Sequence, residues 1–153
     1  MRQFVIKPLV SVGDIEFGMD RREAREILGE CEEYRNRPED VNTADSFDIC
    51  QVFYSESDKV EFIMFHELDG IELRWGDQML NEMTKDELFS FFTPLDESLS
   101  VEDDVEGDMV SFESNALGVA CYFVKDIDYD EDDNEIEFEK VETISFAVEN
   151  FWA

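Results

Sequence analysis

The sequence predicts an α+β fold made of two tandem repeats, each a helix followed by three strands. A short helix pattern at residues 18–29 occurs again at 82–94, and runs of strand length follow each copy. The 14 phenylalanines among 153 residues supply enough apolar surface for a core. We therefore expect a single domain over 1–153 with repeats at about 10–75 and 76–150, antiparallel sheets and helices packed on one face.

The first helix pattern has a start signal and a stop signal. Asp20 is placed to cap the helix, and Glu23 stands three residues later, where a capping-box carboxylate reaches back to the N–H of the cap residue. Apolar residues between these signals form one narrow stripe. Gly29 supplies the left-handed residue that ends many helices.

The second copy lies 64 residues further on and keeps the same layout. Thr84 replaces Asp20 as the cap, and Glu87 again stands three residues later. The pattern predicts a helix over about Lys85–Phe92, and Pro94 then prevents its continuation.

Strands are predicted where β-rich or alternating apolar residues run between turn signals. The clearest is Gly70–Trp75, in which apolar and charged residues alternate strictly. The predicted strands are Gln3–Ile6, Phe47–Tyr54, Val60–Phe65, Gly70–Trp75, Met109–Phe112, Leu117–Val124 and Ile136–Val148. Cys50 and Cys121 fall within them, and with Cys31 they read as three free thiols in a reducing compartment.

The net charge of −29 is the most unusual feature of the composition, and it is distributed unevenly along the chain. Residues 1–37 carry a net charge of −1, whereas residues 38–153 carry −28. Charge of this size repels itself and destabilises a compact state. An acidic proteome would account for it, and so would a basic partner. Direct binding to nucleic acid is argued against, because the sign of the charge is wrong.

Three acidic clusters are candidates for binding a basic protein, which their charge would steer toward them. They lie near residue 45, between 96 and 108, and at 126–137; Glu39 and Asp40 belong to the first. Aromatic anchors among them would be Tyr34, Phe47 or Tyr129. The predicted partner-binding residues are Asp45, Asp48, Glu102, Asp103, Asp104, Glu106, Asp126, Asp128, Asp130, Asp132 and Asp133.

The stretch 126–137 also has the acid spacing of a calcium-binding EF-hand loop. Glu131 occupies the position where such a loop needs glycine, and the flanks read as strands, so a hairpin tip is the favoured interpretation. His66 is the single histidine, and no cysteine or carboxylate spacing marks a nucleophile or a zinc site. We expect no catalytic residue, metal or cofactor.

The helix motif resembles the repeat of secreted β-lactamase inhibitor proteins and the unit of small outer-membrane assembly lipoproteins. It is also similar to two-copy cytosolic bacterial proteins that include candidate toxin-immunity proteins. The resemblance implies a fold that works by binding other proteins. The residues that carry it are Gly18, Met19, Arg21, Glu23, Leu28 and Gly29, with Met83, Lys85 and Glu87 in the second copy.

The function expected from charge and resemblance together is that of a non-enzymatic acidic immunity protein, which occludes the substrate-binding surface of a basic, nuclease-like toxin. A nucleic-acid mimic that inhibits a DNA- or RNA-binding enzyme is the first alternative, and a small enzyme using carboxylates or His66 is the second. The short apolar stretch at the N-terminus argues against a signal peptide, and the sequence has no membrane span. A cytoplasmic location is therefore expected.

Overall fold

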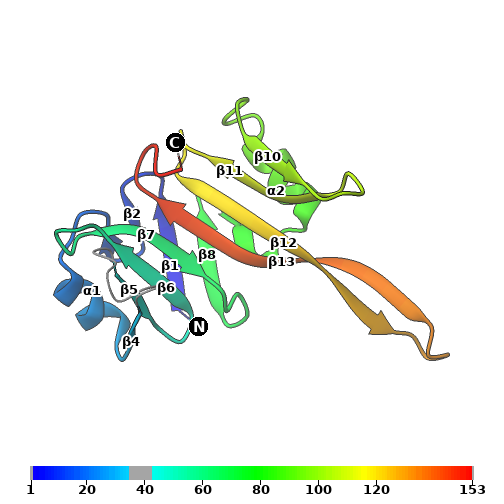
Figure 1. Cartoon of the computed structure of the whole chain (residues 1–153), viewed down its shortest axis with the longest axis horizontal. Coiled ribbons are helices and arrows are strands. Elements are labelled where there is room, and N and C mark those ends of the chain that lie inside the picture. The colour runs from blue at the N-terminus through cyan, green and yellow to red at the C-terminus, as the bar shows by residue number, and fades with distance from the viewer. Residues whose placement is uncertain (1, 35–42, 153) are drawn as a thin grey trace.

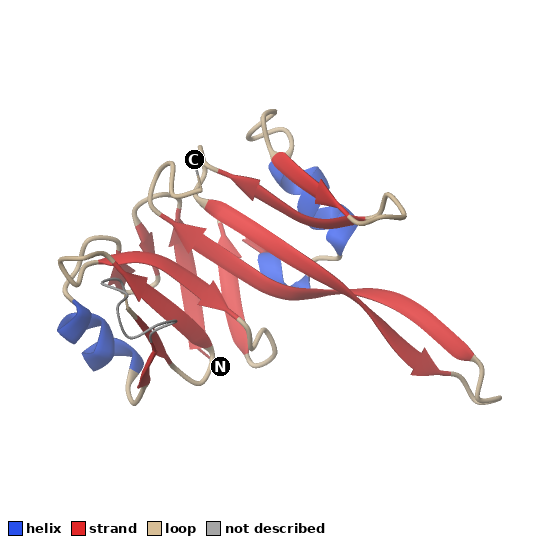
Figure 2. Ribbon diagram, in the orientation of Figure 1, coloured by secondary structure: helices blue, strands red, loops and turns tan. Residues whose placement is uncertain are grey.

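The computed structural model describes residues 2–34 and 43–152, and strands dominate it (Figure 2). Eight strands form one sheet in the order β10-β11-β12-β13-β7-β6-β5-β4, with every neighbouring pair antiparallel. Their bounds are β4 Glu32–Tyr34, β5 Ala44–Ser46, β6 Cys50–Tyr54, β7 Val60–Phe65, β10 Ser100–Asp103, β11 Met109–Ser114, β12 Val119–Tyr129 and β13 Glu135–Ala147.

A second sheet of five strands has the order β3-β2-β1-β8-β9. Its central pair, β1 and β8, is parallel and joins Arg2 to Ile71 in register, so segments about 70 residues apart lie side by side. The strands are β1 Arg2–Lys7, β2 Ser11–Val12, β3 Ile15–Glu16, β8 Ile71–Trp75 and β9 Gln78–Met79.

The helices are short: α1 is Arg21–Leu28, α2 is Lys85–Phe92, and a 3₁₀ turn, η1, spans Leu80–Glu82. Helix α2 has the predicted bounds, and its capping box is formed as predicted, with Thr84 and Glu87 each bonded to the other's backbone N–H. Helix α1 has no side-chain cap. Asp20 instead pairs with Lys59 of the strand hairpin opposite, which removes its carboxylate from the helix end.

The hydrophobic core lies on one face of the eight-stranded sheet. Phe4 of the five-stranded sheet packs on Phe65 with ring centroids 5.0 Å apart. Helix α2 covers the neighbouring part of the same face, where Phe92 contacts Phe112 at 5.9 Å. Ala24 and Leu28 of α1 are buried in the same cluster. The opposite face of the sheet carries the more polar residues of the alternating strands.

The predicted α+β fold of two helix-covered repeats is wrong. Of the residues that the structure describes, 49% lie in strands and 13% in helices, and the strands form two sheets of five and eight. The two eight-residue helices, α1 and α2, are too small to cover the eight-stranded sheet alone, so the five-stranded sheet covers the rest of its core face. The strand Gly70–Trp75, expected to complete the first repeat, leaves that sheet as β8 and pairs with β1.

Candidate functional site

Strands β12 and β13 continue past the body of the molecule as a two-stranded arm, shown in orange and brown in Figure 1. The pairing runs from Val119 opposite Phe146 to Tyr129 opposite Glu135. Every residue from 125 to 140 is exposed. We call residues 126–137 the acidic arm. The arm extends away from the hydrophobic core, so packing in that core does not explain its length.

The acidic arm alternates carboxylates with apolar residues. It holds eight acids and no basic residue. Residues directly opposite each other in an antiparallel pair share a face, so Asp128 and Ile136 lie together, and Tyr129 lies with Glu135 on the other face. Each face therefore combines carboxylates with apolar surface. Tyr129 is 59% exposed and Ile136 47% exposed.

The turn at the end of the arm confirms the prediction of a hairpin tip. Asp130 accepts hydrogen bonds from the backbone N–H groups of Asp132 and Asn134, both at 2.9 Å. These bonds to Asn134 and Asp132 lower the pKa of Asp130 despite the opposing effect of desolvation. The carboxylate that the EF-hand spacing would make a calcium ligand is therefore bonded within its own turn. Within 2–34 and 43–152, no three His, Cys, Asp or Glu side chains are arranged to hold a metal ion.

Lys125 joins the acidic arm to a second acidic segment, Glu102–Asp108, which we call the acidic turn. Its ammonium lies 2.6 Å from Asp108 and 3.4 Å from Glu106 of the acidic turn, and 3.7 Å from Glu137 of the arm. A hydrogen bond from Lys125 to Asp108 is the largest cause of the raised pKa of this lysine. Two acidic clusters that are distant in sequence thus form one surface, on which Glu102, Asp103 and Glu106 are exposed and Asp104 is half-buried.

Asp45, by contrast, is buried. Arg25 binds its carboxylate through two hydrogen bonds of 2.7 Å, Arg21 adds bonds of 3.0 and 3.3 Å, and the Tyr54 hydroxyl donates a further one at 2.8 Å. Burial disfavours ionisation, but the bonds from Arg25, Arg21 and Tyr54 outweigh it and lower the pKa of Asp45 to about 2. We call these four residues the arginine clamp. It fastens α1 to β5 and β6.

Asp45 therefore presents no carboxylate to a partner. Asp48, predicted beside it, is exposed in the bend before β6. Phe47, one of the predicted anchors, is buried in the core. Glu39 and Asp40 lie outside the described residues, as does the side chain of Tyr34. Of the three predicted clusters, the structure brings together the second and third.

One feature of the sequence, the spacing of two arginines, points to the arginine clamp. Arg21 and Arg25 are four residues apart and so lie on one face of α1, where they form a double positive charge. The guanidinium of Arg21 also lies 4.5 Å from the centre of the Tyr54 ring. Two positive charges on one helix face predict an acid that balances them, but the spacing of the arginines does not identify which acid it is.

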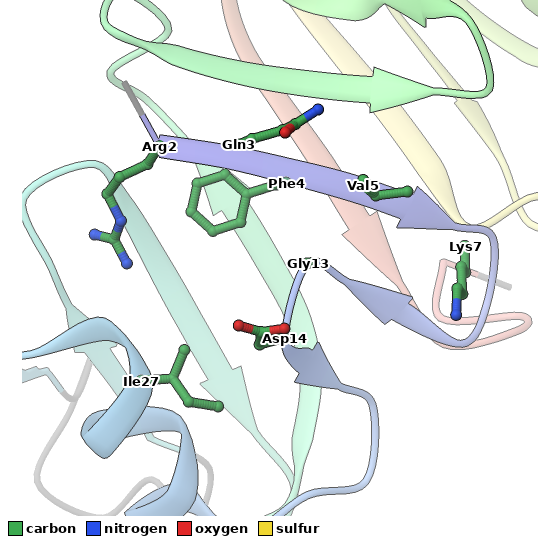
Figure 3. A pocket seen from close by; sticks show the side chains of 8 residues that line it. All are labelled: Arg2, Gln3, Phe4, Val5, Lys7, Gly13, Asp14 and Ile27. Carbon is green, nitrogen blue, oxygen red and sulfur yellow. The ribbon is translucent and has the colours of Figure 1, made fainter.

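A cavity of about 440 Å³ opens beside β1, between the turn that carries Gly13 and the end of α1 (Figure 3). Arg2 and Lys7 line it with one acid, Asp14, and its apolar wall includes Phe4 and Ile27. It brings together no nucleophile, base and orienting group of the kind that covalent catalysis needs. Elsewhere, Cys50 is fully buried, which raises its pKa to about 12 and suppresses the reactive thiolate.

Comparison with protein-family models, curated proteins and solved structures finds no match for this chain. Among the described residues, neither α1 nor α2 nor the 3₁₀ turn is long and apolar enough to cross a lipid bilayer.

Proposed function

We propose that this protein is a non-enzymatic binding protein that captures a basic protein surface with its acidic arm and acidic turn. The single observation that carries the proposal is the arm itself: eight carboxylates and three exposed apolar side chains on a ribbon that projects from the core. An isolated two-stranded hairpin is marginally stable in water, and like charges weaken it further. A basic partner would neutralise those charges and cover the apolar residues.

The mixed composition of the arm suits both stages of binding. Its carboxylates would attract a basic partner over a distance and raise the association rate. Charge adds more to rate and specificity than to affinity, so contact area is needed as well. Tyr129 and Phe138 provide exposed aromatic surface on opposite faces of the ribbon, and aromatic residues dominate interface hot spots.

The partner we propose is a nuclease-like toxin, which is basic because its substrate is a polyanion. The acidic surface would occupy the substrate-binding face and block access to it. This identification rests on the charge and on the helix-motif resemblance to inhibitor proteins. It makes the chain an immunity protein.

A nucleic-acid mimic is the second candidate, and one feature of the arm favours it. Asp126 and Asp128 alternate with apolar residues along β12, so their side chains stand on one face about 6.8 Å apart, at a regular spacing of negative charge. A mimic would inhibit many unrelated nucleic-acid-binding enzymes with similar affinity. An immunity protein would discriminate strongly in favour of its cognate toxin.

The test is calorimetric binding to the basic protein encoded by the neighbouring gene, using three forms of the chain. The arm variant is Asp126→Asn/Asp128→Asn/Glu137→Gln. The matched control, Glu16→Gln/Glu23→Gln/Glu26→Gln, removes the same charge from exposed sites at α1 and β3. We expect the arm variant to weaken binding about tenfold or more at low salt and the control to change it less than about twofold. Equal losses would refute a localised acidic surface, and a neighbour without a toxin domain would refute the immunity role.

A further inference from the structure

A groove crosses the solvent-facing side of the eight-stranded sheet, opposite the core. Its floor is made of small residues on adjacent strands, because Ala120 of β12 stands in register with Ser145 of β13, and Ser111 of β11 lies in the next row. The hollow has a volume of about 190 Å³. Small side chains in the middle of a sheet face leave the space that larger residues would fill.

Aromatic side chains form the two walls of the groove. Tyr122 stands on one side and is 46% exposed. On the other side Phe62 stacks on Phe151 with centroids 5.0 Å apart and meets Trp152 edge-on at 6.0 Å. The backbone N–H of Trp152 donates a hydrogen bond of 3.0 Å to the side-chain oxygen of Asn115, which ties this wall to the body of the molecule. Aromatic faces on both sides suit a flat cation or a second aromatic group.

Carboxylates beside the groove favour a flat cation over a second aromatic group as its occupant. Glu113 lines the groove and is half-buried, and Glu102 lies diagonally across on β10. Within the described part of the chain, neither forms an ion pair. Burial and the neighbouring Glu102 raise the pKa of Glu113, which accords with the absence of a positive partner for this pair. An incoming cation would supply it.

We infer that this groove binds an arginine side chain of the basic partner, with the guanidinium between the aromatic walls and hydrogen-bonded to Glu113. Arginine fits better than lysine because its planar fork stacks on aromatic rings and pairs with a carboxylate through two bonds. The hydroxyls of Ser111 and Thr143 provide further acceptors on the floor. A second copy of this chain is a poor occupant, since each copy carries a net charge of −29.

The inference rests on the proposed function for its biological meaning, because it adds an anchor to the acidic surface. The groove itself is testable without any partner. The probe is the capped tripeptide Gly-Arg-Gly, followed by the shifts of backbone amide NMR signals, with the citrulline and lysine analogues as comparisons. Citrulline keeps the shape of the side chain and removes its charge.

We expect saturable shifts confined to amides of β11, β12, β13 and the C-terminal turn, several-fold weaker for lysine and absent for citrulline. Glu113→Gln should weaken binding about tenfold, and Tyr122→Ala about two- to fivefold. The matched control Glu23→Gln removes an exposed carboxylate from α1, near the other edge of the sheet, and should leave the affinity unchanged.

The inference would be overturned if the peptide caused no shifts in the groove, if citrulline caused equal shifts, or if Glu113→Gln left the affinity unchanged. Shifts that follow protein concentration without peptide would indicate a second copy instead and would also overturn it. The arm variant separates this inference from the proposed function. If the arm variant no longer binds the basic partner but still binds the peptide, both the proposed function and the arginine groove are supported. If neither the wild type nor any variant binds a basic partner, but the wild type binds the peptide, only the groove is supported.

Discussion

The arginine clamp and the acidic arm contain the same type of side chain in opposite circumstances. Asp45 is buried and surrounded by two arginines and a tyrosine hydroxyl. Asp128 is exposed on a ribbon with no basic residue between 126 and 137. A buried carboxylate must be paired, whereas an exposed one needs only water. The clamp therefore holds the fold together, and the arm remains available for a partner.

The largest effect should come from Asp45→Asn. The substitution leaves Arg21 and Arg25 close together without the charge that balances them, and breaking a buried pair costs about 3–5 kcal/mol in the free energy of unfolding. Urea denaturation measures this directly. Asp128→Asn, the matched change on the arm, should alter the free energy of unfolding by less than about 0.5 kcal/mol. Equal effects at the two sites would show that the buried and the exposed carboxylate do not differ in their contribution to stability.

The clamp also makes stability depend on pH in an acidic window. The pKa of Asp45 is lowered to about 2 in the folded chain, against about 3.9 when unfolded. Its contribution of about 2.6 kcal/mol is therefore complete above about pH 5 and is lost as the pH falls through about 2. Unfolding of the wild type and Asp45→Asn in urea across this range should show the difference between them shrinking toward low pH. A constant difference would mean that Asp45 is not ionised in the clamp.

A smaller effect is expected at Lys125, where the arm joins the acidic turn. Lys125→Gln removes the cation shared by Asp108, Glu106 and Glu137. The midpoint of thermal unfolding should fall, and fall less at about 1 M salt than at about 0.01 M, because screening shortens the Debye length from about 30 Å to about 3 Å. Lys140→Gln is the control of equal charge further along β13. The same salt response in both variants would argue against a specific role for Lys125.

Shortening the arm should also have only a small effect on stability. Replacing residues 128–136 by Asn-Gly joins Ile127 to Glu137, which already face each other, through the two-residue turn that such a pair favours. The described residues between them are exposed, so the free energy of unfolding should change by less than about 1 kcal/mol. A large loss in a urea titration would show that the arm supports the fold.

Local features of this fold could be predicted from sequence, whereas its long-range pairing could not. The bounds of α2 and β7 and the hairpin at 126–137 follow from capping and alternation, which involve neighbouring residues. The parallel pairing of β1 with β8 spans most of the first half of the chain, and periodicity does not identify a strand's partner. The same limit placed Asp45 at the surface, because its arginine partners lie 20 and 24 residues away.

Calorimetric binding of the shortened-arm variant tests the central claim most directly, with the neighbour-encoded basic protein as the titrant. The account predicts that this variant unfolds like the wild type and yet loses at least about 100-fold in affinity, or about 2.7 kcal/mol. An unchanged affinity in a correctly folded variant would show that the acidic arm is not the binding surface.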